Sequence, residues 1–235
     1  MPRETALILG ASKGLGQDIA AECHRHEWRT IEVASSLATA STDDRVTMRC
    51  DLRHQSDVEA LIGRLRVGTP IDHFFWVAGA WWEGEFAEMS PEEMLRLIDV
   101  NFRNAMLVAH AVWERFAISS KAPLTYTVIG STSGVRPRKH QEVYAATKYA
   151  QVGFARSLGE SNRDSKNVKV SLFVLGGMRT HLFDAKPPAN LAEFMDPAKV
   201  AAHIISRVSE QEDPRQPSYF EQEISRDTPL GQALR

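Results

Sequence analysis

Three glycines near the start of the chain constrain its fold more than any other feature of the sequence. Gly10, Gly14 and Gly16 follow the apolar run Thr5–Leu9 and lead into Leu15–His26, where apolar residues recur at helical spacing. This order predicts a strand, a tight turn and a helix. Such a turn lets the backbone approach a pyrophosphate, which the free N–H groups of the helix attract. We therefore predict a dinucleotide site; the alternative is a turn needed only for strand–helix packing.

Strand-like and helix-like segments alternate along the rest of the chain. The predicted strands are Thr5–Leu9, Thr30–Val33, Val46–Arg49, His73–Val77, Leu124–Ile129 and Val168–Val174, with Tyr219–Ile224 as an edge strand. The later predicted helices are Ser56–Leu65, Pro91–Ala117, Val143–Asn162 and Pro197–Ser209. This alternation predicts an α/β fold, a doubly wound and mostly parallel Rossmann sheet of about seven strands with helices on both faces. One domain is expected to span residues 1–235.

The composition argues against several other classes of protein. A formal net charge of -2 gives no broad attraction to nucleic acid or to anionic membranes. No apolar run approaches the roughly 20 residues of a membrane-spanning helix, and no secretory leader is evident, so a cytoplasmic protein is expected. Cys23 and Cys50 form no disulfide or metal-binding pattern, and no metal site is predicted.

The residues around the glycine turn indicate which nicotinamide cofactor would bind. A carboxylate after the second strand would accept a hydrogen bond from a ribose 2′-hydroxyl, but this chain has Ser35 and Ser36 there. Lys13 lies inside the turn and, with these serines, could bind a 2′-phosphate. The alternative for Lys13 is a solvated surface lysine. We expect NADP(H) in preference to NAD(H).

Tyr144 and Lys148 are four residues apart and therefore share one face of the helix predicted there. A neighbouring ammonium group favours the phenolate, so it lowers the pKa of a tyrosine toward the range useful in acid–base catalysis. The pair alone is common by chance, and its alternative is an ordinary pair on a helix surface.

The order of these motifs resembles that of the short-chain dehydrogenase/reductase family, from Thr5 to about Val208. The family's landmarks occur here in its order, as Gly10–Gly16, Val77–Gly79, Asn101, Ser131 and Tyr144 with Lys148.

The resemblance implies roles for four catalytic residues. Tyr144 would be the general acid/base, and Lys148 would lower its pKa and bind the nicotinamide ribose. Ser131 would orient the substrate oxygen, and Asn101 would hold a proton-relay water.

The resemblance also implies a set of cofactor contacts. They are Gly10, Ser12, Lys13, Gly14, Leu15, Gly16, Ser35, Ser36, Asp51, Leu52, Ala78, Gly79, Tyr144, Lys148, Gly176 and Thr180. For Asp51 the alternative is a cap for the helix beginning near Ser56. The chain departs from the family at Val77 and Leu175, where asparagine and proline are usual.

The implied activity is hydride transfer between nicotinamide and a small carbonyl or alcohol substrate. The expected assembly is a homodimer, with a tetramer as the alternative. Residues 178–195 are expected to form a substrate loop. An aromatic wall could be formed by Trp81, Trp82, Phe183 and Phe194, and the alternative for each is an ordinary packing role. A basic cluster, residues 136–140, is either a ligand site or a solvated face. The alternative function is a non-catalytic NADP(H)-binding regulator of the same fold.

Overall fold

The computed structural model describes residues 3–117, 124–213 and 215–235. Its strands join in one sheet of eight, in the order β3-β4-β2-β1-β5-β6-β7-β8, and every pairing except β3 with β4 is parallel. The strands are β1 Thr5–Leu9, β2 Arg29–Ala34, β3 Ala40–Ser41, β4 Arg45–Arg49, β5 His73–Trp76, β6 Leu124–Ser131, β7 Val168–Leu175 and β8 Tyr219–Ile224. The predicted doubly wound Rossmann sheet is therefore confirmed.

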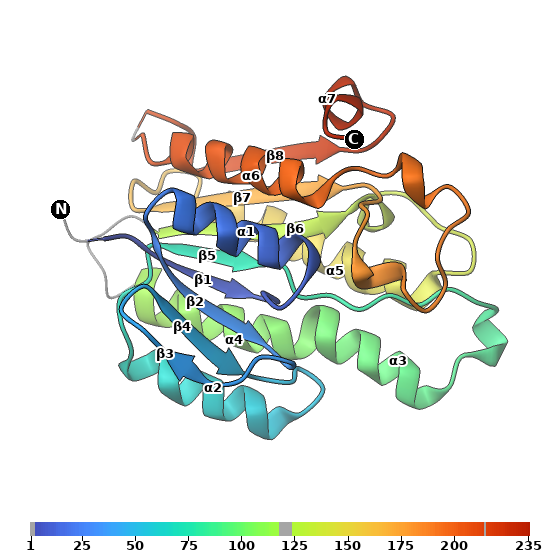
Figure 1. Cartoon of the computed structure of the whole chain (residues 1–235), viewed down its shortest axis with the longest axis horizontal. Helices are drawn as coiled ribbons and strands as arrows, with labels where there is room; N and C mark the ends of the chain where they lie inside the picture. The colour runs from blue at the N-terminus through green and yellow to red at the C-terminus, as the bar shows by residue number, and fades with distance from the viewer. Residues whose placement is uncertain (1–2, 118–123, 214) are drawn as a thin grey trace.

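Helices cover both faces of the sheet (Figure 1). They are α1 Gly14–Arg25, α2 Gln55–Val67, α3 Pro91–Ile98, α4 Asn104–Val112, α5 Glu142–Ser161, α6 Pro197–Gln211 and α7 Pro229–Ala233. On one face, α1 and α6 pack apolar side chains such as Ile19 and Ile204 against the sheet. On the other, α2, α4 and α5 do so with Leu61, Val108 and Val152. Because both faces are covered, β1, β5 and β7 are buried along their whole length.

The starts of α3 and α6 are fixed by a capping side chain followed by proline. Ser90 accepts a hydrogen bond from the Glu93 N–H ahead of α3, and Asp196 accepts one from the Ala198 N–H ahead of α6. In both helices proline occupies the first position, where its missing N–H costs nothing.

Three local features differ from the sequence-based expectation, and one of them is the short helix α7, which was not predicted. The two-residue strand β3 was not predicted, because only its antiparallel pairing with β4 defines it. The helix expected over Pro91–Ala117 is helical but not uniform, since π-helical turns at Asp99–Arg103 and Trp113–Ala117 follow α3 and α4. A π turn inserts a residue into the helix and is frequent at functional sites.

The strand order reverses direction between β1 and β5, so a crevice opens at the carboxyl ends of these strands. The glycine turn follows β1, and Val77–Gly79 follows β5, which places both at this crevice. None of the helices in the described part of the chain has the length and apolar character needed to span a bilayer.

Candidate active site

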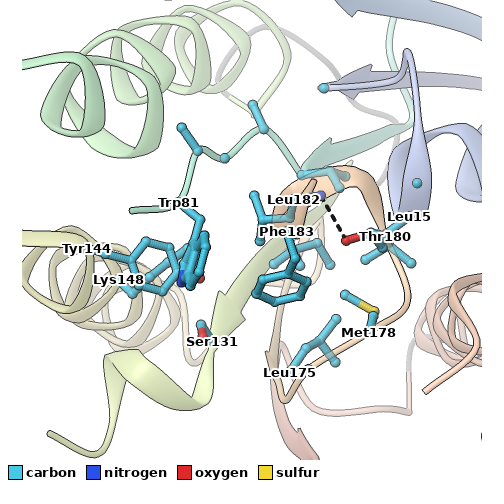
Figure 2. A pocket seen from close by; sticks show the side chains of 18 of the residues that line it. Leu15, Trp81, Ser131, Tyr144, Lys148, Leu175, Met178, Thr180, Leu182 and Phe183 are labelled. Carbon is cyan, nitrogen blue, oxygen red and sulfur yellow. Dashed lines mark hydrogen bonds between the residues drawn. The ribbon is translucent and has the colours of Figure 1, made fainter. Parts of the chain in front are cut away.

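A cavity of about 1260 Å³ lies at the carboxyl edge of the sheet. Its lining runs from the glycine turn to the start of α5 and to the loop after β7. Figure 2 shows Tyr144, Lys148 and Ser131 on one side, and Thr180, Leu182 and Phe183 across from them. Segments far apart in the sequence thus meet around one space.

The glycine turn is tight enough that side chains are excluded at two of its positions. Gly10 has a φ of +102°, and a Cβ there would lie 2.5 Å from the Ala78 backbone nitrogen. A Cβ on Gly16 would lie 2.0 Å from the Gly10 carbonyl oxygen. The turn is held to the sheet by hydrogen bonds from the Gly10 and Ala11 N–H groups to the Val33 carbonyl. The free N–H groups at the start of α1 therefore face the cavity.

Fifteen of the sixteen residues expected to contact the cofactor line this cavity, namely Gly10, Ser12, Lys13, Gly14, Leu15, Gly16, Ser35, Asp51, Leu52, Ala78, Gly79, Tyr144, Lys148, Gly176 and Thr180. Ser36 is the exception: it is exposed in the turn after β2 and does not line the cavity.

Asp51 is buried in the cavity wall, and the structure does not give it the role of a helix cap. Its carboxylate accepts hydrogen bonds from the Arg53 backbone and side chain, with a shortest contact of 2.5 Å. These hydrogen bonds hold the pKa of Asp51 below its usual value. The residue before α2 is His54, and it is Asp57 that accepts a hydrogen bond from the Asp51 N–H.

The departures from the family pattern leave the backbone in place. The N–H groups of Val77 and Ala78 both donate to the Leu9 carbonyl, at 3.0 and 2.7 Å. The Gly176 N–H donates to the Ile224 carbonyl at 2.8 Å, directly after Leu175. Neighbouring strands therefore anchor both segments without the asparagine or the proline.

Ser131, Tyr144 and Lys148 come together at the inner end of the cavity. Ser131 ends β6, while α5 presents Tyr144 and Lys148 from successive turns. The Lys148 Nζ lies 5.9 Å from the centroid of the Tyr144 ring. A Cβ added to Gly79 would lie 3.5 Å from the same Nζ, in van der Waals contact with the ammonium.

Burial dominates the protonation of this pair. It raises the pKa of Tyr144, while the Ser131 hydroxyl and the positive charge of Arg138 act in the opposite direction. Burial lowers the pKa of Lys148 to about 8. In the protein alone the tyrosine is therefore a protonated phenol at neutral pH, which is the form that can donate a proton.

Asn101 lies behind the cavity wall and does not line it. Its side-chain oxygen accepts from the Ala80 N–H at 2.6 Å, and its amide donates to the Ala80 carbonyl and the Thr147 hydroxyl, both at 2.9 Å. Thr147 in turn donates to the Tyr144 carbonyl. The amide thus ties the segment after β5 to the helix that carries Tyr144.

Gln151 was not predicted from the sequence as part of the site. Its side chain is fully buried, and its Oε1 accepts a 2.7 Å hydrogen bond from the Lys148 Nζ. The spacing of three residues on α5 was the signal that could have revealed it, because such residues are neighbours on a helix face. Gln151 fixes the direction of the ammonium group.

Aromatic side chains line the cavity beside Tyr144 and Lys148 (Figure 2). Trp81 meets Phe183 edge-on at 5.1 Å between ring centroids, and Phe183 meets Phe194 in the same way at 5.6 Å. Trp82, which was expected in this wall, does not line the cavity. The loop over residues 178–195 is closed at its base by a bridge between Met178 and Met195.

In the basic cluster, residues 136–140, two side chains lie beside carboxylates and a third, Arg138, faces the cavity. Arg136 pairs with Glu223 at 2.7 Å, and His140 faces Glu85 at 3.2 Å. Arg138 lines the cavity and donates to the Thr132 hydroxyl at 3.1 Å. No carboxylate of the described residues lies within ion-pair distance of its guanidinium.

These features fit a nicotinamide dinucleotide. The space at the start of α1 would hold the pyrophosphate, since a Cβ at Gly10 or Gly16 would collide with the backbone that shapes this turn. The cavity continues from there to Lys148 and Tyr144, which would bind the ribose and face the reacting ring.

Known proteins are similar to this chain in sequence. A putative ketoacyl reductase of Streptomyces coelicolor is 29% identical over 170 residues, which span 66% of this chain and 64% of that protein, just under two thirds of its length. The rat 3-oxoacyl-[acyl-carrier-protein] reductase is 24% identical over 84% of this chain and 88% of its own.

Solved structures share the fold. A short-chain dehydrogenase from Sphingobium yanoikuyae in complex with NADPH superimposes with a TM-score of 0.80 at 23% identity, covering 94% of this chain and 87% of that one. The 3-ketoacyl-(acyl-carrier-protein) reductase from Brucella melitensis, complexed with NADH, gives 0.79 at 19% identity, covering 95% and 97%.

The short chain dehydrogenase family profile matches residues 4–190, which include the glycine turn, Ser131, Tyr144 and Lys148. With these residues gathered around one cavity, the chain belongs to the short-chain dehydrogenase family and is an NAD(P)-dependent oxidoreductase.

Proposed function

We propose that the protein is an NADP(H)-dependent carbonyl reductase or alcohol dehydrogenase in which Tyr144 is the general acid/base. The observation that carries this proposal is the meeting of Ser131, Tyr144 and Lys148 in the cavity that begins at the glycine turn. A protein that only bound the cofactor would have no need for this proton-transfer group.

Each side chain has a distinct part in the proposed reduction. The bound nicotinamide supplies the hydride. The Ser131 hydroxyl donates a hydrogen bond to the substrate carbonyl oxygen, and the Tyr144 hydroxyl gives its proton to the same oxygen as negative charge develops there. The raised pKa of Tyr144 suits this acid role, because the phenol stays protonated at neutral pH. The Trp81 and Phe183 rings limit the access of water.

Replacing Lys13 with alanine is expected to weaken NADPH binding about 10- to 100-fold and to leave NADH binding nearly unchanged. Lys13 lines the cavity and is exposed, so its ammonium can reach a 2′-phosphate, and a charge-assisted contact contributes about 1.5–3 kcal/mol. Fluorescence titration with both cofactors measures the difference. Lys139→Ala is the matched control, since Lys139 is exposed and lies outside the cavity lining. Equal losses for both cofactors in Lys13→Ala would refute the phosphate contact.

The activity itself is tested by turnover. Purified protein with NADPH is assayed against a panel of ketones and aldehydes, beginning with 3-oxoacyl thioesters because relatives are 3-oxoacyl-[acyl-carrier-protein] reductases. Consumption of NADPH with one of these carbonyls is the expected result. Tight NADPH binding with no turnover on any of them would favour the regulator over the enzyme.

We also infer a homodimer through α4 and α5. Leu107 on α4 and Tyr149 on α5 are 38% and 45% exposed, which is high for large apolar side chains on helices of the core. By contrast, Leu97 and Val108 are fully buried and face inward. Leu107→Glu is therefore expected to halve the mass measured by light scattering. Val67→Glu is the control, since Val67 on α2 is 84% exposed, and it should leave the measured mass unchanged. A parent protein that is already monomeric would contradict the inferred dimer.

A further inference from the structure

At the amino edge of the sheet, opposite the active-site cavity, three side chains converge from separate parts of the chain. Glu4 precedes β1, His73 begins β5, and Glu212 follows α6. The His73 Nε2 lies 3.5 Å from a Glu4 carboxylate oxygen and 3.8 Å from one of Glu212. One ligand atom of each residue lies within 4.8 Å of the other two. This edge is the end of the molecule near the N-terminus (Figure 1).

The His73 ring is held so that one nitrogen faces the two carboxylates. The side chain is 2% exposed, and its ring stacks on Trp28 with centroids 3.8 Å apart and planes 10° from parallel. Nδ1 makes a 2.7 Å hydrogen bond with the Thr125 hydroxyl on β6. Nε2 is buried and has no hydrogen-bond partner among the described residues, and the same is true of the Glu212 oxygen that faces it.

Two carboxylates face one buried nitrogen, and a positive charge between them would offset their mutual repulsion. A proton on Nε2 fits the geometry poorly. Charge-assisted hydrogen bonds are about 2.7–2.9 Å long, shorter than both distances from Nε2 to the carboxylates, and one N–H can donate to only one of the two carboxylates. Asp72 adds a further negative charge nearby.

The spacing matches a metal ion better than a proton. Zinc binds imidazole nitrogen and carboxylate oxygen at about 2.0–2.2 Å, so two ligands at the tetrahedral angle lie about 3.4 Å apart. The two distances from Nε2 are close to this value, and the glutamates are 41% and 36% exposed, which leaves them free to adjust. Zinc-bound histidine usually engages its second nitrogen in a hydrogen bond, as His73 does with Thr125.

We propose that Glu4, His73 and Glu212 form a binding site for a divalent transition-metal ion of the zinc class, completed by water. The ion would join the starts of β1 and β5 to the end of α6. It lies at the opposite edge of the sheet from Tyr144, so its function would be to stabilise the fold and it would take no part in hydride transfer.

The test uses the untagged full chain after treatment with a chelator. Zinc titration by calorimetry is expected to show one binding event per chain that is lost in Glu212→Gln and in Glu4→Gln, with at least a tenfold fall in affinity. Saturating zinc should raise the Tm of the parent protein by about 5 °C and leave the Tm of both variants unchanged. Both variants should fold, because both glutamates are partly exposed. Titration with Co²⁺ gives a second readout, a visible absorption band that the parent protein shows and both variants lose.

Glu210→Gln is the matched control, because Glu210 lies in the last turn of α6, just before Glu212, but pairs with Arg207. It should bind zinc as the parent protein does. Zinc binding of equal strength in Glu212→Gln and the parent would assign the ion to surface histidines and overturn the proposal. The absence of any zinc binding would also overturn the proposal, and a proton would then be the positive charge between the carboxylates.

Discussion

Replacing Tyr144 with phenylalanine is expected to lower carbonyl turnover about 1,000-fold while NADPH binding is retained. The change removes one oxygen from a buried side chain, so the packing of the ring against Ala80 and Leu97 survives. What is lost is the proton that the phenol would deliver to the substrate oxygen, and a positioned general acid contributes about 100- to 10,000-fold. Turnover is measured as kcat with the best carbonyl substrate, and binding by titration with NADPH.

Tyr126→Phe is the matched control for this experiment. Tyr126 is fully buried in the sheet, and its hydroxyl has no hydrogen-bond partner among the described residues. Removing that hydroxyl is expected to leave activity unchanged and stability equal or slightly higher, since an unpartnered buried polar group is costly. Full turnover in Tyr144→Phe would contradict the assigned role. Loss of NADPH binding in that variant would instead show that the phenol holds the cofactor.

The second large effect is expected at the glycine turn. Gly10→Ala should lower the free energy of unfolding by about 3 kcal/mol and abolish tight NADPH binding. The φ of +102° is unfavourable for alanine, and its Cβ would lie 2.5 Å from the Ala78 backbone nitrogen, which hydrogen bonds hold to Leu9. The two segments can separate only if the hydrogen bond from Gly10 to Val33 or the one from Ala78 to Leu9 breaks. Urea unfolding gives the stability, and titration gives the affinity.

Gly63→Ala is the control for the same substitution. Gly63 is exposed within α2, and an added Cβ would contact nothing within 4 Å. Alanine there is expected to stabilise the protein by about 0.5–1 kcal/mol, because glycine in a helix loses more chain entropy on folding. Equal stability of Gly10→Ala and the parent would show that the turn can relax around a side chain, and the argument for its rigidity would fail.

The fold was predictable because its signals are local. The strand Thr5–Leu9 and the helix after it could be inferred from apolar periodicity, and capped proline starts marked α3 and α6. The parallel sheet followed from the alternation of these elements. Strand β3 was missed because nothing in two residues distinguishes a strand from a loop until β4 lies beside it. The π-helical turn around Asn101 has no periodicity of its own and was likewise not predicted.

The candidate site was predictable where residues share a helix face or a turn. The glycine turn, and Tyr144 with Lys148, needed only neighbours in sequence, and the family's order added Ser131. Other outcomes could not be inferred from these local patterns. Glu223 neutralises Arg136, and the turn after β2 directs Ser36 out of the cavity.

The sequence by itself determined the doubly wound sheet and the crevice where a dinucleotide binds, because periodicity and turn chemistry act over a few residues. Only the tertiary structure decided that the Asn101 side chain forms hydrogen bonds with Ala80 and Thr147. The same is true of the convergence of Glu4, His73 and Glu212 at the opposite edge of the sheet. The reason is physical: the order of strands in the sheet brings the amino ends of β1 and β5 together, and α6 returns beside them. Such contacts arise from long-range packing, which no local pattern encodes.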